Sequence, residues 1–100
     1  GHAEMKGSDT TAVEMIKTLK NSVQALHIHD NDKLNDNHQI PFSMKIDFVP
    51  IVKALKEIGY DGYFTLESSY YLDNYKKEDV PECVKNLKDA ARKLADMFEE

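Results

Sequence analysis

The sequence has little cysteine and little arginine and lacks any long apolar run, and each absence excludes a class of protein. Its single cysteine, Cys83, cannot form an intramolecular disulfide, so nothing indicates an oxidising compartment. No apolar run approaches the roughly 20 residues of a membrane span. The first residues also lack the apolar segment of a signal peptide. We therefore expect a cytoplasmic protein with no membrane partner.

The charge balance is acidic, with 13 Lys and Arg against 18 Asp and Glu and a net charge of -5. Arg92 is the only arginine. Binding to a phosphate backbone needs a concentration of basic side chains, so this composition argues against a nucleic-acid partner. The same acidic balance suits a site that gathers carboxylates around a cation.

A chain of 100 residues is at most one small domain, and its 41% hydrophobic content allows only a modest core. The first residue is Gly1 and not an initiator methionine. We therefore expect the chain to derive from a larger protein, a recombinant piece or a processed product.

Three segments have the spacing of amphipathic helices. The first is predicted from about Asp9 to Asn21, with Thr11 and Glu14 as a capping box. The second is predicted from Phe48 to Ile58, after Asp47 as N-cap. The third follows the tyrosine-rich stretch "SSYYLDNYKK", which we expect to be a loop, and begins with a second predicted capping box formed by Asp79 and Glu82.

Two segments alternate like strands, Val23 to His29 and Tyr63 to Glu67. A polar connection without apolar periodicity runs between them, from Asp30 to Lys45. Connections of this length in compact domains are usually functional or disordered.

The predicted order is helix, strand, helix, strand, helix. Strands separated by single helices pair in parallel through right-handed crossovers, so the predicted class is α/β with two parallel strands. Two parallel strands have open edges and do not make an ordinary stable domain. The pattern therefore predicts a piece of a larger parallel sheet or barrel, and an isolated chain that associates with itself.

Residue types that bind metals stand at the ends of both predicted strands. His27 and His29 fall on one face of the first strand, and Glu67 ends the second. In a parallel βα array the functional residues gather at these carboxyl ends. A single histidine there is more often structural, but two on one face beside a glutamate favour a metal site.

The long connection holds a second candidate pair, Asp36 and His38, separated by one residue. Both side chains of an Asp-x-His sequence can turn inward from an extended backbone, although a solvated polar loop is the simpler reading. His2 has two readings as well, because Gly-His at a chain start is either native sequence or the remnant of a purification tag.

Three motifs together resemble a known family. "ALHIHDND", then "DNH", then "IDFVPIVKALKEIGYDGYFTLES" are similar to the C-terminal part of the xylose isomerase-like TIM barrels. This superfamily contains sugar phosphate isomerases and epimerases and also the AP endonuclease family 2 of DNA-repair enzymes. "GHA" at the chain start matches the tail of a family motif, which favours native sequence there. The resemblance covers nearly all of residues 1–100 and implies a C-terminal fragment of a partial (β/α)8 TIM barrel.

The resemblance implies roles for individual residues. His27 matches a metal-ligand histidine, and Glu67 matches the glutamate that binds the metal and acts as acid and base on a sugar carbon. His2 matches a histidine that contacts substrate in the sugar enzymes and binds a further metal in the endonuclease-like members. Asp36 and His38 match the Asp-x-His sequence that binds this further metal together with that histidine in the endonuclease-like members.

His29 has no firm family role, and we expect it to line the substrate pocket. The loop departs from the family pattern, because "PFSMKIDF" lacks the glycines that usually precede "IDF". A complete barrel takes about 250 residues, so the family's first metal-ligand glutamate and its aspartate fall outside this chain.

The resemblance implies a metal-dependent sugar or sugar phosphate isomerase or epimerase that moves a proton through an enediolate. Mixed histidine and carboxylate ligands suit Mn, Mg, Co or Zn, and the sequence does not choose among them. The alternatives are an endonuclease IV-like phosphodiesterase and a non-catalytic fragment that associates with itself.

Overall fold

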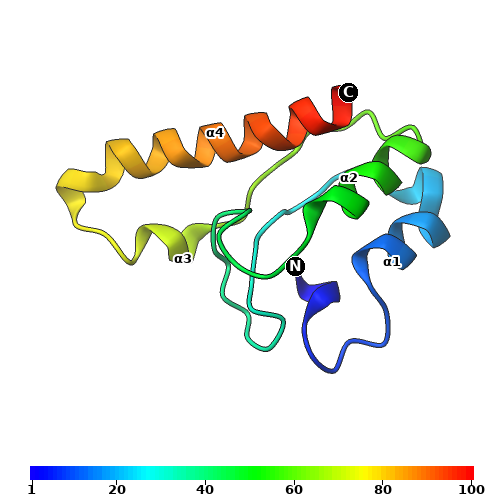
Figure 1. Cartoon of the computed structure of the whole chain (residues 1–100), viewed down its shortest axis with the longest axis horizontal. Coiled ribbons are helices and arrows are strands. Elements are labelled where there is room, and N and C mark those ends of the chain that lie inside the picture. The colour runs from blue at the N-terminus through cyan, green and yellow to red at the C-terminus, as the bar shows by residue number, and fades with distance from the viewer.

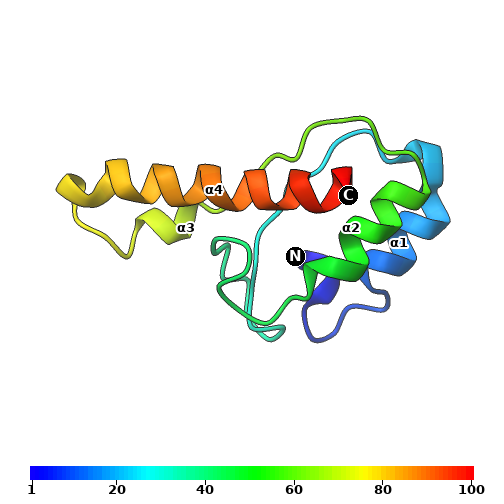
Figure 2. The same ribbon diagram turned by 45° about the horizontal axis from the view of Figure 1, so that its top comes forward.

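The computed structural model describes the backbone of residues 1–100 and every side chain except that of Ser69. Its helices are α1 (Ala12–Leu19), α2 (Phe48–Glu57), the short α3 (Ser69–Leu72) and α4 (Val80–Glu99). In Figure 1, α4 runs along one side of the molecule, while α1 and α2 lie together at one end. Figure 2 shows the extended segments crossing between these helices.

α1 confirms the predicted helix but is shorter at both ends. It begins at Ala12 because the Thr11 hydroxyl accepts the Glu14 backbone N–H at 3.2 Å. The Glu14 carboxylate accepts a hydrogen bond from the Thr10 hydroxyl, at 3.2 Å. The helix ends at Leu19, because Lys20 takes a positive φ of 46° and breaks the helical backbone.

α2 confirms the second predicted helix almost to the residue. Asp47 accepts the backbone N–H of Val49 at 3.1 Å and caps the amino end. Gly59 follows the helix with φ 73°, and the Tyr60 N–H bonds back to the Leu55 carbonyl at 3.0 Å. This is the glycine stop that ends many helices.

α4 has the expected place, but its predicted capping box is wrong. The Asp79 side chain makes no capping hydrogen bond. The tyrosine-rich stretch is also only partly a loop. It contains the short helix α3. Tyr71 of α3 is buried against α4, where its hydroxyl accepts a hydrogen bond from the Asn86 amide at 3.1 Å.

The two predicted strands do not form a sheet. Among the described residues, the model has only isolated bridges, one parallel between Ile28 and Leu66 and one antiparallel between Asp30 and Gln39. The Ile28 N–H donates to the Thr65 carbonyl at 2.8 Å, and the Ile28 carbonyl accepts the Glu67 backbone N–H at 2.7 Å. The predicted parallel direction is thus present at one point. Two strands without neighbours gain too little packing energy to form a longer ladder of hydrogen bonds. The partial barrel therefore remains a prediction.

α2 lies at the centre of the core and contributes to two apolar clusters. The first joins it to α1, and the second joins it to α4. The buried members of the two clusters are Ile16, Ala54, Leu55 and Tyr60, and then Ile46, Phe48, Val52 and Leu94. Cys83 is buried on α4, as expected for a helix-core residue. None of the helices described combines the length and the apolar character needed to span a membrane.

Candidate metal centre

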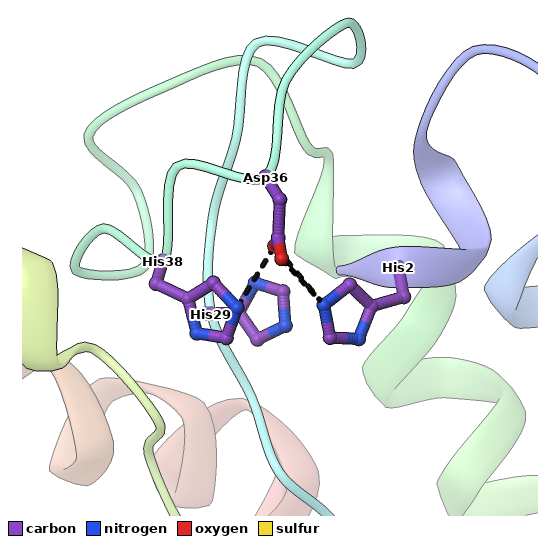
Figure 3. A group of neighbouring side chains, drawn as sticks. All are labelled: His2, His29, Asp36 and His38. Atoms are coloured by element: carbon purple, nitrogen blue, oxygen red, sulfur yellow. Dashed lines mark hydrogen bonds and ion pairs between the residues drawn. The ribbon is translucent and has the colours of Figure 1, made fainter.

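Four side chains from three parts of the chain converge on one point: His2, His29, Asp36 and His38. His2 lies on the 3-10 turn His2–Glu4, and His29 follows the parallel bridge. Each residue offers one donor atom, and all four atoms lie within 4.8 Å of one another. Figure 3 shows the three imidazoles arranged around the Asp36 carboxylate.

The Asp36 carboxylate holds two of the imidazoles. His2 Nε2 lies 3.0 Å from Asp36 Oδ2, and His38 Nε2 lies 2.9 Å from Asp36 Oδ1. Partial burial acts to raise the pKa of Asp36, but the hydrogen bonds from His2 and His38 outweigh it and the pKa lies below its ordinary value. Asp36 is therefore ionised at neutral pH and available as an anionic ligand.

His29 is the most enclosed member of the group, with 1% of its surface exposed. Its ring stacks on His38 with centroids 4.1 Å apart and an angle of 10°, and it meets the edge of His2 at 4.7 Å. Its Nδ1 has no hydrogen-bond partner among the described residues. Burial lowers the pKa of His29 to about 4, with help from the nearby amino terminus and from His38 and His2. The ring is therefore neutral at pH 7.

Gly1 allows the chain start to lie directly against His29. A Cβ atom at Gly1 would overlap the His29 ring, so only glycine permits this approach. The Asn31 amide fixes the contact by donating to the Gly1 carbonyl at 3.0 Å. The placement of His2 thus depends on a glycine and on a buried asparagine that the sequence analysis did not assign.

The loop that carries Asp36 and His38 is anchored by Asp30, which is 0% exposed. The Asp30 carboxylate accepts the backbone N–H groups of Asn31, Met44 and Ile46 at 2.8, 2.9 and 3.0 Å. The backbone of Asp30 also pairs with Gln39 in both directions. The sequence pattern marks this aspartate only as the first residue of the polar connection, and the structure gives it a role in holding the loop closed.

Inside the loop, short polar side chains accept hydrogen bonds from backbone N–H groups. Asp32 Oδ1 accepts the N–H groups of Leu34 and Asn35, at 2.9 and 2.8 Å, and these bonds lower the pKa of Asp32. His38 has a φ of 45°, which non-glycine residues seldom adopt. Residues held in such conformations concentrate at functional sites, where the surrounding structure compensates for the strain.

Glu67 connects the group to His27. Glu67 Oε2 lies 2.8 Å from His27 Nδ1, and its other oxygen lies 3.3 Å from His38 Nδ1. His27 is 69% exposed at its side chain and is not one of the four converging residues. The two histidines predicted to share a face are thus placed differently, His29 in the buried group and His27 at the surface beside Glu67.

Both ring nitrogens of His38 face oxygen atoms. Its Nδ1 lies 3.3 Å from the backbone carbonyl of Glu67, while Nε2 faces Asp36. A neutral imidazole has one N–H, so His38 donates either from Nδ1 to this carbonyl or from Nε2 to Asp36, and only the first arrangement leaves the Nε2 lone pair free for a metal. Metal-binding histidines are commonly oriented by such a bond at the other ring nitrogen.

Aromatic and apolar side chains surround the site. Tyr70 is half exposed, with its ring centroid 5.2 Å from that of His38, so it lies at the edge of the group. The Phe42 ring packs on Phe48 with centroids 5.4 Å apart, and the Lys93 ammonium lies 4.1 Å from its centroid, so Phe42 anchors the loop to α2 and α4.

An apolar groove of about 500 Å³ opens beside the histidines. It lies between α1, α2 and residues 23–29, and its lining includes Met15, Leu26, Ile51, His27 and His29. The groove therefore connects the exposed apolar side of the predicted first strand with the candidate site.

Comparisons with known proteins match these features to a family. A family model described as xylose isomerase-like TIM barrel matches residues 1–100. The uncharacterized protein MJ1311 of Methanocaldococcus jannaschii is 31% identical over 80 residues, which are 80% of this chain and 27% of that protein. The uncharacterized protein y4fM of Sinorhizobium fredii is 39% identical over 57 residues, 47% of this chain and 18% of that protein.

The chain thus spans about a quarter or less of the length of the curated relatives it matches. No solved structure matches it. The family match extends over the whole sequence, including the segments that carry all four converging side chains. The chain belongs to the xylose isomerase-like TIM barrel family.

Proposed function

We propose that this chain is the C-terminal part of a divalent-metal-dependent sugar or sugar phosphate isomerase or epimerase. The observation that carries the proposal is the pairing of Glu67 with His27 at 2.8 Å, beside the parallel bridge between Ile28 and Leu66. A carboxylate in this position lies where βα arrays hold their functional residues. It is also partly exposed, so a substrate can reach it.

The side chains at the site fit a divalent ion. The ionised Asp36 supplies an oxygen donor, and the neighbouring imidazoles of His2 and His38 supply nitrogen donors. A bound ion supplies Lewis-acid stabilisation of negative charge on neighbouring sugar oxygens. We assign His27 and Glu67 to metal binding, with His2, Asp36 and His38 as further ligands. His2 and His29 also line the place where substrate would bind.

In this proposal Glu67 moves the proton. Its carboxylate takes a proton from a sugar carbon and returns it to the neighbouring carbon. His27, which contacts the same carboxylate, orients it toward the substrate. An epimerase needs a second carboxylate on the opposite face of the sugar, and we expect the parts of the family barrel outside this chain to provide it.

The test uses the longer protein that contains this chain and compares Glu67→Gln with Glu82→Gln, an exposed position on α4. We expect Glu67→Gln to abolish exchange of a carbon-bound sugar proton with solvent, while far-UV circular dichroism stays unchanged. The Glu82→Gln protein should exchange at the wild-type rate. Normal exchange in the Glu67→Gln protein would remove this glutamate from the proposed role.

A second function is supported by a different observation. His2, Asp36 and His38 lie together, and the resemblance gives these three positions an additional metal in the endonuclease IV-like members. A metal-dependent phosphodiesterase is therefore the alternative. The net charge of -5 argues against a DNA substrate. Metal-dependent cleavage of DNA at an abasic site by the longer protein would favour this alternative.

For the isolated 100-residue chain we propose little or no isomerase activity and a tendency to self-associate. The family's first metal-ligand glutamate and its aspartate lie outside the sequence, so the catalytic ligand set is incomplete. The groove of about 500 Å³ also leaves apolar side chains open to water. Such surfaces commonly become interfaces.

A further inference from the structure

We propose that Ser68 is a positioning residue. Its hydroxyl ties the end of the second extended segment to the loop that carries His38, and this contact holds Glu67 beside that histidine. The inference deepens the proposed function and rests on the role proposed there for Glu67. Ser68 is itself buried, so it acts through its neighbour and not by contact with a substrate.

The first argument is the direction of the Ser68 hydrogen bond. Ser68 occupies the N-cap position of α3, where a serine side chain ordinarily accepts a backbone N–H from the first turn of the helix. Here the side chain makes no capping bond. Its hydroxyl donates instead to the backbone carbonyl of Gln39, at 3.0 Å and 29 residues away in the sequence. The serine thus connects two distant segments where a local helix cap would be the usual arrangement.

The second argument is that this bond closes a ring of contacts among three segments. The Ile28 carbonyl accepts the Glu67 backbone N–H at 2.7 Å. Asp30 exchanges two backbone hydrogen bonds with Gln39, at 2.8 and 3.1 Å. The first extended segment therefore holds both the segment end and the loop, and the Ser68 hydroxyl joins these two to each other. Its removal takes away a direct link between the loop and the residue next to Glu67.

The third argument is what the ring of contacts positions. His38 Nδ1 lies 3.3 Å from the Glu67 carbonyl oxygen and 3.3 Å from Glu67 Oε1. His38 directly precedes Gln39 and has a φ of 45°. A non-glycine residue keeps such a conformation only where the surrounding interactions hold it. The bonds from Asp30 and Ser68 to Gln39 supply that support, so a loosened Gln39 should let His38 move away from Glu67.

The fourth argument is that Gln39 has other contacts that keep the fold together when Ser68 is changed. Its carbonyl also accepts the Asp30 N–H, which uses the second lone pair of that oxygen. Its side chain accepts from the Asn74 amide at 3.2 Å and donates to the Asn37 carbonyl at 3.0 Å. Loss of the hydroxyl should therefore leave the chain folded, and its effect should fall on the geometry between His38 and Glu67.

The first test measures exchange of a carbon-bound sugar proton in the longer protein. Ser68→Ala should lower kcat and kcat/KM together, by about ten- to a hundredfold, because a small displacement of a reacting group slows the reaction while the substrate still binds. Ser68→Thr keeps the hydroxyl and should retain most of the rate. Ser43→Ala is the matched control, since the exposed Ser43 hydroxyl also donates to a backbone carbonyl, that of Ile40 at 2.6 Å, but within its own turn. It should react at the wild-type rate.

The second test needs no reaction. In the 100-residue chain, a nuclear Overhauser contact between the His38 ring and the Glu67 side chain should be present in the wild type, in Ser68→Thr and in Ser43→Ala. It should be weakened or lost in Ser68→Ala. A retained contact in Ser68→Ala overturns the inference, and so does an equal loss in Ser68→Thr or Ser43→Ala.

The two tests separate this inference from the proposed function. Normal proton exchange in Glu67→Gln would remove the proposed function, whereas the Overhauser contact is measured without substrate and tests Ser68 alone. If Glu67→Gln is inactive, an unchanged exchange rate in Ser68→Ala would overturn the positioning role.

Discussion

Replacement of Asp30 by alanine should destabilise the chain more than any change at its surface. The carboxylate is completely buried and accepts three backbone N–H groups, from Asn31, Met44 and Ile46. A hydrogen bond to a charged group contributes about 1.5–3 kcal/mol to stability, and a buried donor left without its partner costs a similar amount. The loss therefore depends on how far water can replace the carboxylate at each N–H.

The three N–H groups differ in how easily water can reach them. The bond to Ile46 is buried, so its loss should cost about 2–3 kcal/mol, whereas the bond to Met44 is only part-buried and should cost about 1.5 kcal/mol. The contact with Asn31 joins neighbouring residues and should add only a small further loss. We therefore expect Asp30→Ala to cost roughly 4–5 kcal/mol. Small domains have about 5–15 kcal/mol in total, so this change removes much of the stability of the chain.

Asp30→Asn provides a graded comparison. Its amide oxygen can replace Oδ1, which serves Asn31 and Ile46, but its NH₂ group would face the Met44 N–H. We expect a loss of roughly 2 kcal/mol, less than half of the alanine effect. Asp9→Ala, at an exposed position, is the control and should change stability by no more than about 0.5 kcal/mol.

The assay is urea unfolding followed by far-UV circular dichroism, together with Zn²⁺ titration of the Asp30→Asn chain. Zn²⁺ affinity should fall about tenfold or more, because the loop that presents Asp36 and His38 loses an anchor. A loss of less than about 1 kcal/mol in the Asp30→Ala chain would refute the assignment of this carboxylate as the anchor of the loop.

Three further predictions concern the same surfaces. Gly1→Ala should weaken Zn²⁺ binding, because the new methyl group overlaps the His29 ring; an unchanged affinity would show that this contact does not position His2. In the metal-free chain, stability should fall as the pH decreases from about 6.5 to about 4, because the unfolded chain takes up a proton on His29 before the folded chain does. Urea midpoints should show a smaller decrease in His29→Gln, and an equal decrease in both proteins would assign the effect to other groups. Light scattering at micromolar concentration should detect association of the isolated chain, and Leu26→Lys in the apolar groove should reduce it; a stable wild-type monomer would contradict the prediction.

The helices could be predicted from the sequence because their signals are local. Asp47 and Gly59 mark the two ends of α2, and both act as the pattern indicates. The capping box at Asp79 was wrong, although the residue types were suitable, because α4 starts directly from a 3-10 turn, Lys77–Asp79. The predicted strands were reduced to one parallel bridge, since pairing depends on neighbours and not on alternation alone.

The site could be predicted in part. The Asp-x-His pair and His2 were candidates from the sequence, and the structure brings all three together. Sequence alternation also placed His27 and His29 on one face, but only His29 lies in the buried group, because Glu67 holds His27 at the surface. The anchoring role of Asp30 could not be predicted, since its partners are backbone groups up to 16 residues away.

The most direct test of the account is the position of the bound ion in crystals of the chain grown with Zn²⁺, located by anomalous diffraction at the zinc edge. We expect zinc bound by Glu67 and His27, with His2, Asp36 and His38 as further ligands. Zinc bound away from these five side chains would contradict the account.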